Sequence, residues 1–233
     1  IKEDDTIPDE TTICKFRNAL IKNNLLESIF LEVKNSMIKN NLILNEGTLV
    51  DATLIHSSEP KKRKDENGKT ISNKANDEDA SYTSKRGRKH HGYKIHIATD
   101  TNSIIKEVIT TTAKTHDSTQ FDTLTKDETK AVFADSGYMS QERKRTLRSK
   151  GIFNGITERR VRGQSKLRTK QSKNNTKFSK VRALVELPFA FIKKLMKYTE
   201  TKYLGLHKNS QHVFLIAAAY NLRRMPNLIQ RYG

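Results

Sequence analysis

The sequence is short of the residues that build cross-linked or membrane-embedded proteins. Its 233 residues include a single cysteine, Cys14, which excludes an internal disulfide and any cysteine-rich zinc site. No apolar run approaches the roughly 20 residues that a membrane-spanning helix requires, so an integral membrane protein is excluded. Any chemistry must therefore depend on carboxylates, histidines and cationic side chains.

Acidic residues are also scarce relative to basic ones. Asp and Glu total 26 against 44 Lys and Arg, which gives a formal net charge of +18. Such an excess of positive charge speeds encounters with polyanions, whatever the fold. We therefore expect a nucleic acid as the partner and rank an anionic membrane surface second. At this length the chain can build one sizeable core with a small appendage.

The N-terminal part has helical periodicity. Apolar residues recur at helical spacing through the segment 1–45, and the pairs Asn23-Asn24 and Asn40-Asn41 interrupt the pattern. We therefore expect two or three short helices here. Part of a DNA-binding region and a packing cap are equal alternatives for them on sequence alone. Because the chain does not begin with methionine, we also expect a further segment before Ile1, such as a recognition module.

The sequence becomes rich in strand-forming residues after Gly47, and we assign residues 46–233 to one catalytic domain. Strands are expected at 48–55, 93–97, 104–111, 131–134 and 152–156, and helices at 116–124, 141–149, 178–198 with a kink at Pro188, and 210–224, ended by Pro226. This order predicts an α/β fold with a mixed sheet and flanking helices, preceded by the small helical N-terminal segment.

Two segments are too polar to be buried. The first, 57–90, is dense in Lys, Arg, Asp and Asn, and we expect it to loop out between two strands. The second, 159–177, contains eight basic residues and no acidic one. It is expected to be a solvated loop or an arm that follows DNA phosphates. Arg159, Arg160 and Arg162 in this arm are candidate phosphate-binding residues.

Three carboxylates occupy notable positions. Asp51 lies inside an apolar strand, where an ionised carboxylate is costly unless something neutralises it. Asp135 directly follows the buried run 131–134, and open sheets place their ligands at the carboxyl ends of strands. Glu186 lies in the helix expected at 178–198. Each acid alone has an ordinary structural explanation, so the hypothesis of a catalytic site depends on their conjunction.

Two cations share a helical stripe with Glu186. Arg182 precedes it by four residues and Lys193 follows it by seven, so at about 100° per residue the three align within roughly 40°. Both cations are candidate phosphate-binding residues. Hard carboxylate oxygens suit Mg²⁺ or Mn²⁺, and a pair of ions about 3.5–4 Å apart would activate a water and stabilise the leaving oxygen. His116 and Asp117 are weaker candidates for the edge of the site.

Short motifs that carry these residues follow one another along nearly the whole chain. They are Ile7-Pro8-Asp9, Val50-Asp51-Ala52-Thr53, Asp79-Ala80, Lys85-Arg86-Gly87, Gly92-Tyr93-Lys94, Thr115-His116-Asp117-Ser118, Ala134-Asp135-Ser136-Gly137-Tyr138, Val185-Glu186-Leu187-Pro188-Phe189 and Asn221-Leu222-Arg223-Arg224. In this order they resemble the DDE insertion-sequence transposases, specifically the group typified by insertion sequence five. No single motif is decisive, whereas the ordered set is very specific.

The resemblance implies a fold like that of ribonuclease H, with Asp51 on the first strand, Asp135 after the fourth and Glu186 on a late helix. These acids would be both catalytic residues and ligands of two divalent ions. The protein would cleave double-stranded DNA at the ends of its own mobile element and join the freed 3′-hydroxyls to a target. One position departs from the family signature, because Ser179 stands where a tyrosine is expected three residues before Arg182.

Further expectations concern assembly, location and alternative functions. A transposase of this kind is expected to act as a homodimer or higher synaptic oligomer, in the bacterial cytoplasm at the nucleoid, without a membrane partner. A related metal-dependent nuclease, such as a structure-specific resolvase, would use the same acids without strand transfer. A catalytically inactive basic nucleic-acid-binding protein is the alternative from another class. The presence of all three acids argues against a degenerate transposase copy.

Overall fold

The computed structural model describes residues 7–60, 62–64, 70–72, 76–85, 87–160 and 162–232. Parts of the predicted segments 1–45, 57–90 and 159–177 lie outside these residues, as does Arg86 of the Lys85-Arg86-Gly87 motif. Within the described ranges, no helix is both long and apolar enough to cross a membrane.

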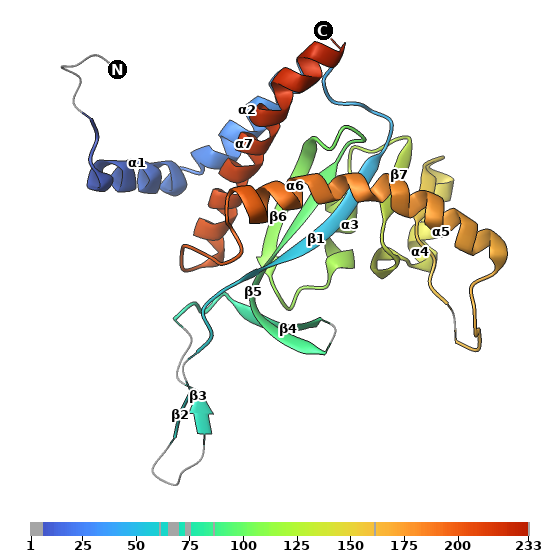
Figure 1. Cartoon of the computed structure of the whole chain (residues 1–233), viewed down its shortest axis with the longest axis horizontal. Coiled ribbons are helices and arrows are strands. Elements are labelled where there is room, and N and C mark those ends of the chain that lie inside the picture. Colours follow the sequence, from blue (N-terminus) through green and yellow to red (C-terminus); the bar gives the residue numbers. More distant parts are fainter. Residues whose placement is uncertain are drawn as a thin grey trace.

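A mixed sheet forms the centre of the molecule (Figure 1). Its strands are β1 (Thr48–His56), β4 (Ser81–Lys85), β5 (Arg88–Thr99), β6 (Ile105–Thr112), β7 (Ala131–Ala134) and β8 (Phe153–Ile156). Four of the pairings give the order β6-β5-β1-β7-β8, and β4 pairs with the first part of β5. β5 is antiparallel to β1 and β6, whereas β7 is parallel to β1 and β8. The ribonuclease H-like mixed sheet expected from the sequence is thereby confirmed.

Helices flank this sheet. They are α1 (Glu10–Lys22), α2 (Leu25–Lys39), α3 (Phe121–Leu124), α4 (Gln141–Ser149), α5 (Thr169–Arg182), α6 (Glu186–Ala190) and α7 (Leu206–Tyr232), with the shorter η1 (Asp117–Gln120), η2 (Ser136–Tyr138), η3 (Ala183–Val185) and η4 (Phe191–Leu195). Leu49 of β1 packs in one apolar cluster with α2, α6 and α7. Its neighbour Val50 packs in another with α3 and α4. Because adjacent strand residues point to opposite faces, the two clusters cover the two faces of the sheet.

The N-terminal helices are separated as the sequence predicted. Asn24 and Asn41 both have a left-handed backbone with φ of 54°, a conformation that asparagine tolerates better than most residues. Phe30 of α2 belongs to the apolar cluster that also contains Leu49, so α2 is part of the central core. In α1 the buried residue is Ile21, and this helix projects from the body (Figure 1). A DNA-binding role for these helices stays a prediction.

The polar stretch 57–90 is not a loop throughout. β2 (Lys62–Lys64) and β3 (Thr70–Ser72) pair with each other, while β4 and the start of β5 extend the main sheet. The side chains of β4 are half-buried or exposed, so this strand has no hydrophobic pattern for a sequence reading to detect. Backbone pairing with β5 holds β4 in place instead.

Buried Asp77 fastens the end of this stretch to the core. Its carboxylate accepts hydrogen bonds from the Tyr93 hydroxyl at 2.6 Å and from the backbone N–H of Gly205 at 3.1 Å. Asp79 Oδ2 accepts from the backbone N–H of Leu206 at 2.8 Å. These bonds join the stretch to β5 and to the first turn of α7.

The helix expected from residue 178 begins earlier, at Thr169. The second half of the basic segment 159–177 is therefore helix α5 rather than a loop. Beyond α5, the chain continues through η3, α6 and η4 as one interrupted helical path to Leu195. The expected distortion near Pro188 is present, because α6 is a short α-helical piece between a 3₁₀ helix and a π-helical turn.

The prediction that Pro226 ends the last helix is wrong. α7 runs from Leu206 to Tyr232 with Pro226 inside it. Proline removes one helical hydrogen bond, but Leu228 beyond it is 3% exposed and belongs to an apolar cluster with Met37, Leu42 and Ile104. Tertiary packing of this last stretch overrides the local preference of the sequence.

This packing predicts a sharp difference between two neighbouring residues. Leu228→Ala should lower the free energy of unfolding by about 2–4 kcal/mol, because it leaves a cavity in a buried cluster. Ile229→Ala removes a side chain that is 50% exposed and should change stability by less than about 0.5 kcal/mol. Urea denaturation of both variants measures the difference. Equal small effects would show that the helix does not pack beyond Pro226.

Candidate active site

Asp51 and Asp135 come from neighbouring parallel strands. β1 and β7 pair in parallel with Leu49 opposite Phe133. Two residues further along this register, Asp51 is level with Asp135, which directly follows β7. Side chains two residues apart in a strand share a face. The sheet therefore directs both acids to the face of Leu49 and Phe133.

The interrupted helix crosses the same face of the sheet (Figure 1). Val185 of η3 and Phe189 of α6 are buried in the apolar cluster that contains Leu49. Phe178 of α5 packs edge-on against Phe133 of β7, with ring centroids 6.1 Å apart. These apolar contacts fix the helix over the ends of β1 and β7.

A direct contact joins this helix to the first acid. Arg182 Nη1 donates a hydrogen bond to Asp51 Oδ2 at 2.8 Å, and the two side chains are 25% and 17% exposed. Glu186 begins α6, four residues after Arg182, and is exposed. The structure thus places Asp51, Arg182 and Glu186 on one side of the sheet, and their catalytic and metal-binding roles stay a prediction.

The environment of Asp51 is strongly perturbed. Burial raises the pKa of its carboxyl to about 6, although the backbone N–H of Ala52 and the guanidinium of Arg182 act to lower it. The negative charges of Asp135 and Glu186 raise this pKa further. The three acids therefore lie close enough to repel one another, and a bound cation would relieve that repulsion.

Three carboxylate oxygens of Asp51 and Asp135 accept hydrogen bonds within the protein. Asp51 accepts from Ala52 N and Arg182, and Asp135 Oδ1 accepts from Gly137 N at 2.7 Å. In the described part of the chain, no group of three acidic, histidine or cysteine side chains is close enough to hold a metal ion. The donor set itself suits Mg²⁺ or Mn²⁺, because it consists of carboxylate oxygens. A metal ion bound at Asp51 Oδ2 would compete with the guanidinium of Arg182 for that oxygen.

Lys193 lies further along the helix, in η4, and is half-buried. Burial lowers the pKa of its ammonium group, the positive charge of Lys85 lowers it further, and Glu186 acts in the opposite direction. Lys85 ends β4, so this strand brings a second cation to the helix. The sequence reading did not assign Lys85 to the site, because β4 had no strand signal.

An ion pair joins η1 to β5. Lys94 Nζ and Asp117 Oδ1 form an ion pair at 2.8 Å, beside a hollow of about 150 Å³ that β1, β4 and β5 line. His116 caps η1 locally, since its Nδ1 contacts the Ser118 hydroxyl at 2.7 Å. Of the two expected rim residues, Asp117 pairs with Lys94, which lies opposite Leu54 on the face of Val50 rather than that of Asp51, whereas His116 has a local role. A place for either residue at the edge of the site stays a prediction.

Arg143 of α4 ties two site segments together. Its guanidinium donates to the carbonyl of Tyr138 and, at 3.0 Å, to that of Ser118. Tyr138 is buried, and burial together with the charges of Asp117 and Asp51 raises the pKa of its hydroxyl. α4 thereby fixes both the turn that follows β7 and the segment that carries Asp117.

The predicted arginines of the basic arm are surface residues. Arg159, Arg160 and Arg162 are exposed between β8 and α5, and Arg160 Nη1 donates to the carbonyl of Ser165 at 2.9 Å. Their binding of phosphate stays a prediction.

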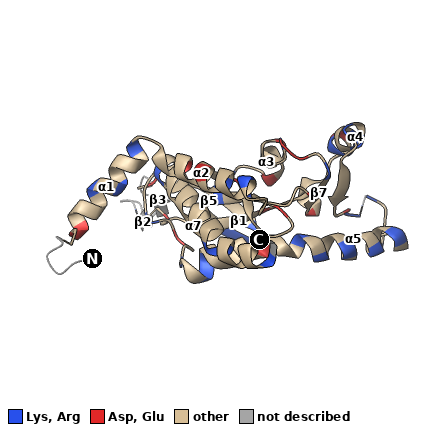
Figure 2. Cartoon of the chain, turned by 90° about the horizontal axis from the view of Figure 1, so that it is seen from above, with Lys and Arg blue, Asp and Glu red and all other residues tan. Residues whose placement is uncertain are grey.

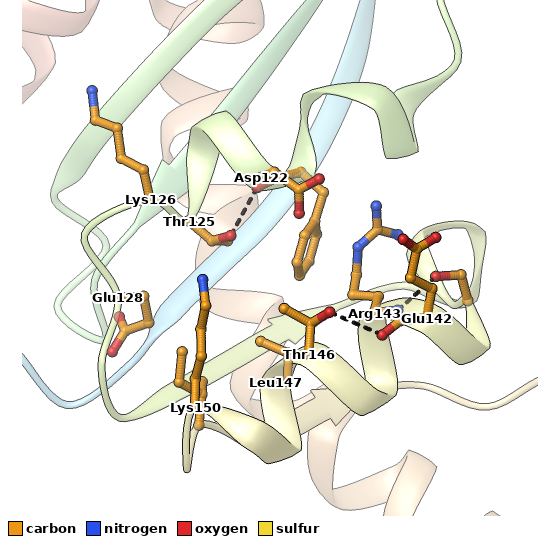
Figure 3. A pocket seen from close by; sticks show the side chains of 12 residues that line it. Asp122, Thr125, Lys126, Glu128, Glu142, Arg143, Thr146, Leu147 and Lys150 are labelled. Atoms are coloured by element: carbon orange, nitrogen blue, oxygen red, sulfur yellow. Dashed lines mark hydrogen bonds between the residues drawn. The ribbon is translucent and has the colours of Figure 1, made fainter.

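A hollow of about 280 Å³ lies between α3 and α4 (Figure 3). Its lining includes Phe121 and Leu147, which belong to the apolar cluster of Val50 on the other face of the sheet from Asp51. Charges of both signs line it, namely Asp122, Lys126, Glu128, Glu142, Arg143 and Lys150. This hollow is separate from the candidate active site.

The raised pKa of Asp51 predicts a specific pH dependence of stability in the absence of divalent ions. Between about pH 4 and pH 6 the unfolded chain has released this proton whereas the folded chain keeps it, so the stability contributed by Asp51 falls as pH rises. Asp51→Asn removes the titration. The stability of the parent minus that of the variant should fall by up to about 3 kcal/mol across this window. Denaturant titrations at several pH values test this, and parallel curves would contradict it.

The ion pair predicts an effect of Arg182→Ala on stability at neutral pH. Without Arg182, the partly buried Asp51 lacks its counter-charge, and unfolding should become easier by about 1–3 kcal/mol, between the values typical of exposed and buried pairs. The double variant Arg182→Ala/Asp51→Asn should recover most of this loss. Arg145→Ala, on an exposed position of α4, is the control. A double variant no more stable than Arg182→Ala would refute the charge explanation.

Comparison with known proteins agrees with this geometry. A family model described as transposase DDE domain matches residues 44–222. The matched range begins before β1, ends within α7 and includes all three acids. A search of the solved structures found no match. Because the match covers well over half of the sequence, the chain belongs to the family of transposase DDE domains.

Proposed function

We propose that this protein is the transposase of an insertion sequence, of the group typified by insertion sequence five. It cleaves double-stranded DNA at the ends of its element and joins the freed 3′-hydroxyls to target DNA. The observation that carries the proposal is the β1–β7 register, which brings Asp51 level with Asp135, together with the bond between Asp51 and Arg182 of the overlying helix. Family membership supports the same assignment.

Asp51, Asp135 and Glu186 are the proposed catalytic residues and the ligands of two Mg²⁺ or Mn²⁺ ions. Such ions, when bound, activate a water or 3′-hydroxyl and stabilise the leaving oxygen. Arg182 neutralises Asp51 in the metal-free protein. Once released, its guanidinium is positioned to bind a phosphate oxygen beside the acids. Lys193 supplies another positive charge to the DNA backbone.

Transposition also requires more than one copy of the protein to act together. Two element ends have to be joined in one reaction, so we propose a homodimer or higher synaptic oligomer, acting at the bacterial nucleoid. A metal-dependent nuclease without strand transfer is the competing function within this family, and it would use the same acids. The joined DNA product distinguishes the two.

Asp135→Asn tests the catalytic assignment better than an alanine substitution. Asparagine retains the oxygen that accepts from Gly137 N but removes the charge that a metal ion requires. Mg²⁺-dependent nicking and joining should fall at least roughly a hundredfold, while DNA affinity persists. The melting temperature should hold or rise, because one repulsive charge beside Asp51 disappears.

Asp122→Asn is the matched control, since Asp122 is an exposed acid beside the separate hollow. Its nicking, joining and melting should equal those of the parent. Wild-type nicking by Asp135→Asn would refute the catalytic assignment. Nicking without joined product in the parent would favour the nuclease, and DNA binding without either reaction would favour an inactive binding protein.

A further inference from the structure

A row of lysines occupies one side of α5. Lys170, Lys173, Lys177 and Lys180 are all exposed, and at 100° per residue they fall within an arc of about 80°. α5 contains no acidic residue, and Figure 2 shows basic residues along its length where it extends from the body. We name these four residues the lysine row.

The opposite side of α5 is docked on the sheet. Asn175 Nδ2 donates to the carbonyl of Glu158 at 2.8 Å, and its Oδ1 accepts from the backbone N–H of Glu158 at 2.9 Å. Phe178 packs edge-on against Phe133 and Phe153, with centroids 6.1 and 5.7 Å apart. Asn175 lies about 180° and Phe178 about 120° around the helix from the middle of the lysine row. The row therefore points outward from a fixed helix.

The lysine row is electrostatically unfavourable in the free protein. Its members are spaced three, four and three residues apart, so each lies next to another positive charge on the helix surface, which destabilises a helix. None of the four forms a salt bridge within the part of the chain that the structure describes. A bound polyanion would relieve this repulsion.

We propose that the lysine row binds the phosphates of one strand of duplex DNA and guides that strand toward Asp51. The inference rests on the proposed function and names the surface by which DNA approaches the site. The ten residue steps from Lys170 to Lys180 span about 15 Å of helix axis. Phosphates of one strand recur about every 3.4 Å along a duplex. The row therefore spans about four phosphates.

The position of the row gives the bound strand a direction. Lys180 lies two residues before Arg182, whose guanidinium contacts Asp51. Lys170 is the second residue of α5, at the end of the helix away from Arg182. DNA held along the row therefore leads to the carboxyl ends of β1 and β7, where the acids lie.

A charge-matched pair of variants tests the lysine row. One variant replaces Lys170, Lys173, Lys177 and Lys180 by glutamine, which retains helix propensity. The control replaces four exposed lysines outside α5 and outside the N-terminal helices by glutamine: Lys130, Lys150, Lys202 and Lys208. Binding of a short fluorescent DNA duplex is measured by anisotropy over a range of salt concentrations, with circular dichroism as a check of folding.

Each phosphate contact contributes about 0.9 to the slope of log affinity against log salt. The lysine-row variant should therefore lose about 3–4 from the parent slope, and the control less than about 1. A third variant with four Lys→Arg substitutions in the row should keep the parent slope, since arginine preserves the charge. Equal losses in the lysine-row and control variants, or no loss in either, would overturn the inference. So would a change seen with single-stranded RNA and not with duplex DNA.

The outcomes separate this inference from the proposed function. If the parent nicks DNA with Mg²⁺ while the lysine-row variant keeps the parent slope, the lysine row is not the DNA surface and the function stands. If the slope falls as expected while the parent neither nicks nor joins DNA, the lysine row binds DNA and the proposed function fails.

Discussion

The parallel pairing of β1 with β7 is the contact on which the candidate site depends. Buried apolar residues such as Leu49 and Val132 maintain this pairing at the centre of the sheet. A slip of one residue would turn an acid to the face covered by α3 and α4. The apolar alternation of the two strands, which serves folding, therefore also determines that Asp51 and Asp135 share a face. The register of β1 with β7 therefore determines both the packing of the core and the face on which the acids lie.

The two paired strands, β1 and β7, were predictable from the sequence. β1 and β7 are short apolar segments with a carboxylate inside one and directly after the other, and both signals are local. β4 and the first half of α5 were not predictable in this way. β4 is held by backbone pairing with β5, and α5 by Phe178 and Asn175 on partners far away in the sequence. Neither buries a periodic apolar stripe of its own.

The helix that carries Arg182 and Glu186 shows a second limit of sequence patterns. The alignment of Arg182 and Glu186 with Lys193 was predicted for a uniform α-helix. In the structure η3 has a 3₁₀ conformation and η4 a π conformation. A 3₁₀ helix has three residues per turn and a π turn has more than an α-helix, so angles deduced from spacing shift. The Arg182–Asp51 bond and the mutual influence of Lys193 and Glu186 come from tertiary docking, which spacing alone does not determine.

The stretch between β1 and β5 is a place where this fold can accept an insertion. His56, the last residue of β1, lies opposite Gly92 inside β5. Gly92 has φ of 147°, and an added Cβ would lie 2.1 Å from the Ile55 carbonyl oxygen, so this position requires glycine. Asp77 fastens the returning chain. Doubling the length of a loop adds only about 0.6 kcal/mol to its closure, so a whole extra module can be accommodated between Pro60 and Asp77 without disturbing the register of β1.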